Sequence, residues 1–223
     1  PGYAAGTGER APLDSAPPKP ESAMPRPLVL TCLLPLLALA AGRLAVPRDA
    51  RAEPELPTVP KTYLAFDDGD SVTIRWPDGP EVVRILGIDT PEVQHLEHDL
   101  PFAQPFGDRA AGFLRGCIAV VDEIRILRAK RKDPYGRTLA YLFLDGKNYS
   151  ALVVAARLAV ANVDHYGDNG LPEPAAEVVA TAKAAGPVPF EEPYRYRARM
   201  RKVSAWMKAR GSYPGVAPDE GGR

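Results

Sequence analysis

The residues from Arg84 to Glu92, Arg-Ile-Leu-Gly-Ile-Asp-Thr-Pro-Glu, place an arginine and two carboxylates at the end of an apolar segment. A strand that only packs into a hydrophobic core needs none of these polar groups. A site that binds a hard cation and a phosphate needs all of them, because carboxylates bind the cation and a guanidinium binds two phosphate oxygens. A structural salt bridge is the alternative explanation for Arg84.

Asp70 is a second acidic position that this chemistry could use. It ends the run Asp67-Asp68-Gly69-Asp70, which by itself is a turn between two expected strands. We expect a meander that brings the first and third strands together, and Asp70 would then lie near Asp89. Two carboxylates, the backbone carbonyl of Thr90 and waters would form an oxygen-only site suited to Ca²⁺, although another divalent ion stays possible.

Phosphodiester hydrolysis also needs a correctly aimed water and stabilisation of the developing charge. Glu92 could orient or deprotonate that water, although a helix or turn cap would also explain it. The turn from Asp133 to Arg137 would present Tyr135 and Arg137 beside the next strand. Arg137 could then act with Arg84 as a second phosphate clamp, or the turn could be an ordinary hairpin loop.

The elements that must position these residues follow from the hydropathy pattern. Five strands are expected from apolar runs and alternation, at residues 63–66, 72–76, 81–88, 120–127 and 138–144. Three helices are expected from helical spacing, at residues 106–117, 148–158 and 196–207, and the alanine-rich residues 175–185 could form a further short helix. The expected fold class is therefore α+β, a five-stranded Greek-key OB-fold barrel with about three helices, because one helix separates the third strand from the fourth.

Together these motifs resemble the staphylococcal nuclease, or thermonuclease, family. The resemblance rests on Asp68-Gly69-Asp70-Ser71-Val72, on Arg84 through Glu92 and on Tyr135-Gly136-Arg137, and it covers roughly residues 61–166 with the terminal helix. It implies a five-stranded barrel and Ca²⁺-dependent cleavage of DNA and RNA to products with 3′-phosphate ends. By position, it implies these roles: cation ligands Asp70, Asp89 and Thr90; phosphate clamps Arg84 and Arg137; water-handling residue Glu92; substrate contact Tyr135.

The chain also departs from the family pattern around the expected site. Pro134 stands where the family often has a lysine that contacts phosphate. The aromatic pair expected after the last short strand is replaced by Val163-Asp164-His165-Tyr166, in which His165 or Tyr166 could stack on a base. These changes concern substrate affinity and preference rather than the cation and phosphate chemistry.

Composition divides the chain into five expected segments, with its 25 prolines concentrated toward both ends. A basic start at Met24 before an apolar run is typical of a secretory signal peptide, and an uncleaved anchor is the alternative. The segments are 1–23, disordered or upstream of the true start; 24–41, signal peptide; 42–60, Pro-rich linker; 61–213, nuclease OB-fold domain; and 214–223, disordered tail. We therefore expect a secreted or periplasmic monomer without stable membrane association after cleavage.

Charge, histidine and cysteine add little that is specific. The 28 basic and 28 acidic residues balance, but basic residues cluster at 125–137 and 195–210, where they could bind nucleic acid or form a solvated face. His95 and His98 lack further nitrogen or sulfur ligands for zinc. Cys117 has the helical spacing of a buried small side chain, with a reactive thiol as the alternative.

The expected function is a Ca²⁺-dependent phosphodiesterase that acts on DNA and RNA. The competing interpretation is a non-catalytic module on the same barrel that binds nucleic acid or protein. Such modules typically lose the arginines or acids, and this chain keeps the whole set: Asp70, Arg84, Asp89, Glu92 and Arg137.

Overall fold

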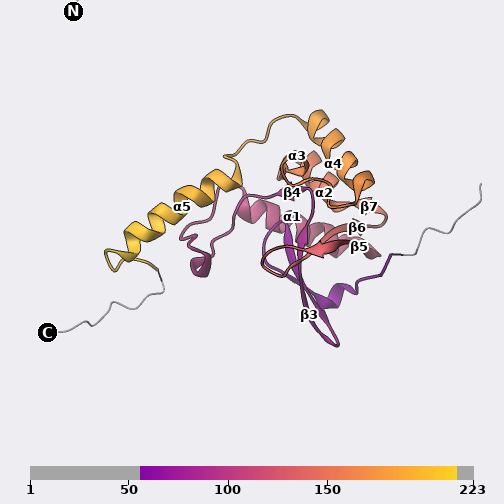
Figure 1. Cartoon of the computed structure of the whole chain (residues 1–223), viewed down its shortest axis with the longest axis horizontal. Coiled ribbons are helices and arrows are strands. Elements are labelled where there is room, and N and C mark those ends of the chain that lie inside the picture. The colour runs from indigo at the N-terminus through magenta and orange to yellow at the C-terminus, as the bar shows by residue number, and fades with distance from the viewer. Residues whose placement is uncertain (1–55, 215–223) are drawn as a thin grey trace, which may run out of the picture. The chain divides into compact units, whose positions relative to one another are not determined.

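The computed structural model describes residues 56–214, which have an α+β architecture built on one curled mixed sheet (Figure 1). The expected signal peptide at 24–41 and the upstream segment 1–23 lie outside the described residues, as do residues 42–55 of the expected linker and 215–223 of the expected tail. Within residues 56–214, no helix combines the length and the apolar character that crossing a bilayer requires.

The main sheet has the strand order β1-β2-β3-β6-β5, with β7 paired to β6. Its strands are β1 (Leu64–Phe66), β2 (Ser71–Trp76), β3 (Gly79–Ile85), β5 (Ile124–Lys132), β6 (Thr138–Leu144) and β7 (Lys147–Asn148). All pairs are antiparallel except β3 with β6, which run parallel. The chain that enters β1 runs along β5 at the opposite edge, since the Val59 amide donates to the Ile124 carbonyl at 2.8 Å.

The five expected strands correspond to β1, β2, β3, β5 and β6, and a separate pair joins β4 (Ile88–Asp89) to β8 (Val160–Ala161). Residues 120–123, expected at the start of the fourth strand, precede β5, because the helix before it continues to Val120. The described residues contain five α-helices rather than about three: α1 (Gly107–Val120), α2 (Tyr149–Ala155), α3 (Val163–Tyr166), α4 (Pro172–Ala185) and α5 (Pro193–Lys208). Both α4 and α5 begin with proline, which fits the first helical turn because its amide is unpaired there.

Alternating side chains of the sheet pack against α1 and α2 to form the core. In β2, Val72 and Ile74 are fully buried while Arg75 is exposed, as the alternation predicts. Cys117 on α1 packs at the edge of this core, and burial raises the pKa of its thiol, which disfavours the reactive thiolate. The helix α5 lies apart from the sheet, as Figure 1 shows in yellow.

The core also anchors the segments that carry the candidate site residues. The buried hydroxyl of Tyr149, on α2, donates to the Gly69 carbonyl at 2.7 Å, within the acidic turn before β2. The hydroxyl of the neighbouring Ser150 donates to the Leu86 carbonyl at 2.7 Å, just after β3. The start of α2 therefore fixes two chain segments that lie on either side of Arg84.

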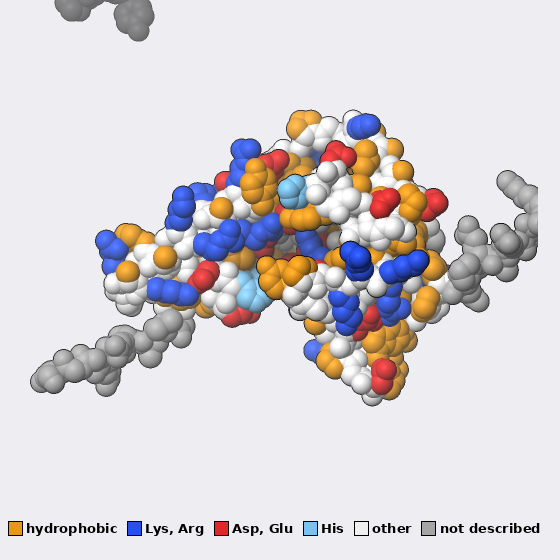
Figure 2. Space-filling model, viewed as in Figure 1, with side chains coloured by type: hydrophobic (Ala, Val, Ile, Leu, Met, Phe, Trp, Pro, Cys, Tyr) orange, Lys and Arg blue, Asp and Glu red, His pale blue; other side chains and the backbone are white. Residues whose placement is uncertain are grey.

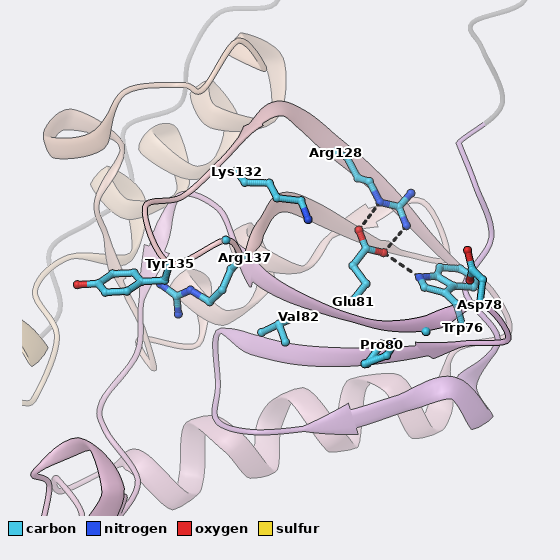
Figure 3. Close-up of a pocket in the computed structure, with 11 residues that line it drawn as sticks. Trp76, Asp78, Pro80, Glu81, Val82, Arg128, Lys132, Tyr135 and Arg137 are labelled. Atoms are coloured by element: carbon cyan, nitrogen blue, oxygen red, sulfur yellow. Dashed lines mark hydrogen bonds and ion pairs between the residues drawn. The ribbon is translucent and has the colours of Figure 1, made fainter.

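At the other end of β3, an ion pair joins Glu81 to β5 (Figure 3). Arg128 donates through Nε and one terminal nitrogen to the two carboxylate oxygens of Glu81, at 2.8 and 2.7 Å. The Trp76 indole donates to the same carboxylate at 2.8 Å. The bonds from Arg128, against the opposing effect of burial, lower the pKa of Glu81 to about 2.

We expect this carboxylate to make stability depend on pH in acid. Because the pKa of Glu81 falls from 4.5 to about 2 on folding, its contribution is present above pH 4.5 and is lost as pH falls toward 2. Glu81→Gln should therefore unfold at lower urea concentration than wild type at pH 6, and the difference should shrink at pH 3. The exposed Glu173→Gln serves as the control; a Glu81→Gln difference that is equal at both pH values would contradict the assignment.

Candidate active site around Arg84

Sheet register brings Asp70 beside Arg84. In the β2–β3 hairpin, Ser71 pairs with Arg84, so the residue before Ser71 lies next to the end of β3. The Ile85 amide donates to the Asp70 carbonyl at 2.8 Å, which extends that pairing by one step. Asp70 is only 4% exposed, so its carboxylate needs partners for its charge.

The Arg84 guanidinium spans the two carboxylates that the sequence predicts as cation ligands. One terminal nitrogen pairs with the Asp70 carboxylate and also donates to the Asp70 carbonyl at 3.2 Å. The other donates to Asp89 Oδ1 at 3.1 Å and to the Ile88 carbonyl at 3.0 Å. Asp70 and Asp89 therefore face one guanidinium. Arg84 thus forms salt bridges, as the alternative explanation for this residue predicted.

Thr90 holds the Asp70 carboxylate in place. Its amide and its hydroxyl both donate to Asp70 Oδ2, at 2.7 and 3.0 Å, and the residue is 2% exposed. The Asp70 amide in turn donates to Asp68 Oδ1 at 2.8 Å. Burial raises the pKa of Asp68, although the charge of Arg84 opposes the shift.

Glu92 joins the cluster through Arg197, a residue of α5 that the sequence did not single out. The two terminal nitrogens of Arg197 donate to Asp89 Oδ1 and Oδ2 at 3.1 and 3.0 Å, and one of them also pairs with Glu92 Oε1. Burial raises the pKa of Glu92 even though Arg197 opposes the shift. Burial lowers the pKa of Arg197, but its bonds to Asp89 and its attraction to both carboxylates outweigh that effect and raise it.

The backbone around Glu92 is held by a buried glutamine. Gln104 receives the Glu92 amide on its side-chain oxygen at 3.2 Å and donates its own amide to the Glu92 carbonyl at 2.8 Å. The side-chain nitrogen of Gln104 donates to the Glu191 carbonyl at 2.5 Å, just before α5. No sequence pattern marked Gln104, because its role depends on contacts between segments that are distant in the chain.

Arg137 and Tyr135 lie beside the cluster but bind none of its members. The Arg137 Nε donates to Asp133 Oδ2 at 2.7 Å, and its guanidinium carbon lies 5.7 Å from the Tyr135 ring centre. Both residues line a groove of about 800 Å³ with Trp76 and Lys132 among its walls (Figure 3). Tyr135 is 85% exposed.

Arg137 is nevertheless electrostatically close to Arg84. It immediately precedes β6, where Thr138 pairs with Val83 of β3. Burial lowers the pKa of Arg84 most strongly, and the positive charges of Arg137 and Arg197 act in the same direction. The predicted second clamp is thus near the first, with its guanidinium bound to Asp133.

His165 and Tyr166 are exposed on α3, Tyr166 by 64%. Their rings contact each other edge to face, with centres 4.4 Å apart. The helix α3 follows β8, in which Val160 pairs with Asp89. No described contact joins either aromatic side chain to the acidic cluster.

The donor chemistry of the cluster fits a hard divalent cation, because Asp70, Asp89 and Glu92 offer only oxygens. Within residues 56–214, however, no three His, Cys, Asp or Glu side chains stand close enough to hold an ion by themselves. Carbonyl oxygens and waters would have to complete the shell. The rings of His95 and His98 stack with their centres 5.4 Å apart.

Gly107, the first residue of α1, lies against the Glu92 backbone. A Cβ at Gly107 would lie 2.1 Å from the Glu92 carbonyl oxygen, so alanine there must displace either segment. We expect Gly107→Ala to lower the free energy of unfolding by about 1–3 kcal/mol. Gly112→Ala, on the same helix with nothing within 4 Å of the added carbon, should be neutral or stabilising. Urea unfolding of both variants checks this, and equal midpoints would contradict the close approach.

Comparison with known proteins found sequence similarity over the middle of the chain. The family model described as staphylococcal nuclease homologue matches residues 82–186. A thermonuclease of Staphylococcus intermedius is 34% identical over 95 residues, which are 42% of this chain and 54% of the relative. The endonuclease YncB of Bacillus subtilis is 29% identical over 93 residues, 41% of this chain and 43% of the relative.

A further relative is the SPbeta prophage-derived endonuclease YokF of Bacillus subtilis, 30% identical over 93 residues, 41% of this chain and 30% of the relative. The chain thus spans about half the length of the thermonuclease and less of the two endonucleases. The matched segment contains Arg84, Asp89, Glu92 and Arg137, whereas Asp70 and α5 lie outside it. Residues 82–186 of the chain are therefore similar to the staphylococcal nuclease family.

Proposed function

We propose that this protein is a Ca²⁺-dependent nuclease that hydrolyses phosphodiester bonds of DNA and RNA and leaves 3′-phosphate ends. The observation that carries the proposal is the contact of one partly buried guanidinium, Arg84, with both Asp70 and Asp89. The relatives named thermonuclease and endonuclease support the same chemistry.

Asp70, Asp89 and the Thr90 carbonyl would hold the cation in this proposal. When bound, the cation would offset the negative charge of the phosphate and polarise it toward attack. Arg84 would supply a planar, permanently charged donor pair to the phosphate oxygens, since it already lies at both carboxylates. Positioned donors of this kind stabilise charge that develops in the transition state.

Glu92 is the proposed base that takes a proton from the attacking water. Its carboxylate lies in the cluster through Arg197, and burial raises its pKa, which makes it a stronger base than an exposed glutamate. Arg137 would add a second positive charge at the phosphate after leaving Asp133. This exchange would break the ion pair with Asp133, in a turn whose residues 134–136 are exposed.

Nucleic acid would approach over basic surface. Figure 2 shows Lys and Arg side chains along α5 and, separately, over the part of the surface that β5 and β6 form. The groove beside Tyr135 combines this charge with aromatic side chains, a pairing that favours single-stranded nucleic acid because bases stack on exposed rings. His165 and Tyr166 are further candidates for such stacking.

Export, cleavage of a signal peptide that begins at Met24 and a monomeric state complete the proposal. Export and cleavage rest on the sequence pattern of residues 24–41.

A plasmid-digestion assay with the purified protein tests the activity. We expect cleavage in Ca²⁺, none in EGTA, and recovery when Ca²⁺ is restored, because the carboxylates need a cation before they can accept a phosphate. Cleavage that continues in EGTA would contradict the cation requirement. Binding of DNA without cleavage under every ion condition would instead support a non-catalytic module.

Replacing Arg84 tests the clamp. Arg84→Ala should reduce kcat/KM by roughly 10²–10⁴-fold, since the transition state loses a charged donor pair. Arg115→Ala, which removes an exposed arginine from α1, is the matched control and should cleave like wild type. Initial rates on a fluorescent oligonucleotide give the comparison. An Arg84→Ala enzyme with wild-type rates would contradict the proposed binding of phosphate by Arg84.

Tyr135 tests the substrate groove. Because the Tyr135 side chain is exposed and does not pack into the core, Tyr135→Ala should leave the melting temperature unchanged. It should raise KM for single-stranded DNA severalfold, in line with about 1–3 kcal/mol for each stacked base. Tyr135→Phe is the control and should keep the wild-type KM; an unchanged KM in Tyr135→Ala would place the substrate elsewhere.

A further inference from the structure

The helix α5 reaches the acidic cluster although it lies beyond the segment that the family model matches. It packs on the loop before α1 through its own small core, in which Tyr196 and Met200 bury Leu100. The Tyr196 hydroxyl donates to the Phe102 carbonyl at 2.9 Å, and Ser204 donates to Asp99 at 2.6 Å. These contacts fix the side of α5 that faces the cluster.

Among the arginines of α5, Arg197 is the one that this docking directs to the site. It makes a two-pronged contact with Asp89 and also pairs with Glu92. Arg199 instead pairs with Glu191 at 2.6 Å, and Arg201 is exposed. Gln104 connects the same two segments, since it bonds to the Glu92 backbone and to Glu191.

We propose that Arg197 is a positioning residue of the active site: it holds the Glu92 carboxylate next to Asp89 and limits how tightly a divalent cation binds there. This inference rests on the proposed nuclease function. A guanidinium that bridges two carboxylates restricts both to one geometry, which a water-activating carboxylate needs. The positive charge of Arg197 also repels a divalent cation at the same carboxylates. Arg197 therefore lowers the affinity for the cation while it fixes the position of Glu92.

Removing the charge of Arg197 should therefore raise the affinity for Ca²⁺ and lower kcat. Arg197→Gln should bind Ca²⁺ more tightly, by about tenfold, because one competing positive charge is gone. The same variant should lose about 10–100-fold in kcat with little change in KM, because Glu92 is no longer held. A residue that only supported the fold would weaken Ca²⁺ binding and activity together.

The experiment titrates Ca²⁺ alone into the full chain by calorimetry and measures kcat and KM on a fluorescent oligonucleotide. Arg197→Gln and Arg197→Lys are compared with Arg201→Gln, which removes the same charge from an exposed position one turn along the helix. Arg197→Lys keeps the positive charge but lacks the planar pair of guanidinium donors that binds both Asp89 oxygens. It should therefore keep the Ca²⁺ affinity within about twofold of wild type and still have a lower kcat. Arg201→Gln should match wild type in both measurements, and melting curves check that each variant is folded.

Tighter Ca²⁺ binding with lower kcat in Arg197→Gln supports the inference. Unchanged affinity and kcat, or affinity that falls together with the melting temperature, would overturn it. If Arg197→Gln does not fold, Arg197→Lys is compared with wild type instead. A wild-type kcat in Arg197→Lys would also overturn the inference. Wild-type protein that neither binds Ca²⁺ nor cleaves would instead refute the proposed function, so the two failures are distinguishable.

Discussion

A partly buried guanidinium that bridges two carboxylates is the interaction on which the rest of the candidate site depends. Burying Arg84 is costly, and burial lowers its pKa, so its charge must be met by partners within the fold. Asp70 and Asp89 meet that charge, and the carbonyls of Asp70 and Ile88 accept the remaining bonds. Without Arg84, the Asp70 carboxylate, which is 4% exposed, would lose its cationic partner. The bridge therefore couples the acidic turn before β2 to the short strand β4.

The fold supports this bridge from several directions. The register of β2 with β3 sets Asp70 beside Arg84, and the amide and hydroxyl of Thr90 hold the Asp70 carboxylate. From the core, Tyr149 binds the turn that carries Asp70. These contacts belong to rigid elements, as a site that must keep carboxylates in fixed positions requires. The segment around Glu92 is held differently, by the loop that packs against α5.

The sequence could predict what depends on local pattern. Alternation in β2, the hairpin that follows and the polar end of β3 were enough to predict that Asp70, Arg84 and Asp89 come together. Arg197 could not be found in this way, because its contact with Asp89 spans 108 positions and depends on how α5 docks. The signal that existed was its place next to the apolar stripe, since Tyr196 and Met200 are buried.

Other differences also have local physical causes. The helix α3 was not expected because it is a single turn, and the alanine-rich α4 was expected only as a possible short helix because its apolar stripe is weak. Arg137 was predicted to act beside Arg84, yet it bonds to Asp133 four positions earlier, a partner available within its own turn. The roles proposed for Arg137, His165 and Tyr166 depend on contacts with substrate, which no pattern in the chain supplies.

The most direct test of the central claim is a crystal structure of the protein grown with Ca²⁺, with the ion located by its anomalous scattering. We expect one ion bonded to carboxylate oxygens of both Asp70 and Asp89, at about 2.3–2.6 Å. We also expect that Arg84 has turned from at least one of these carboxylates toward the open side of the ion. An ion bound elsewhere, or intact Arg84 ion pairs with no ion between the two carboxylates, would contradict the central claim.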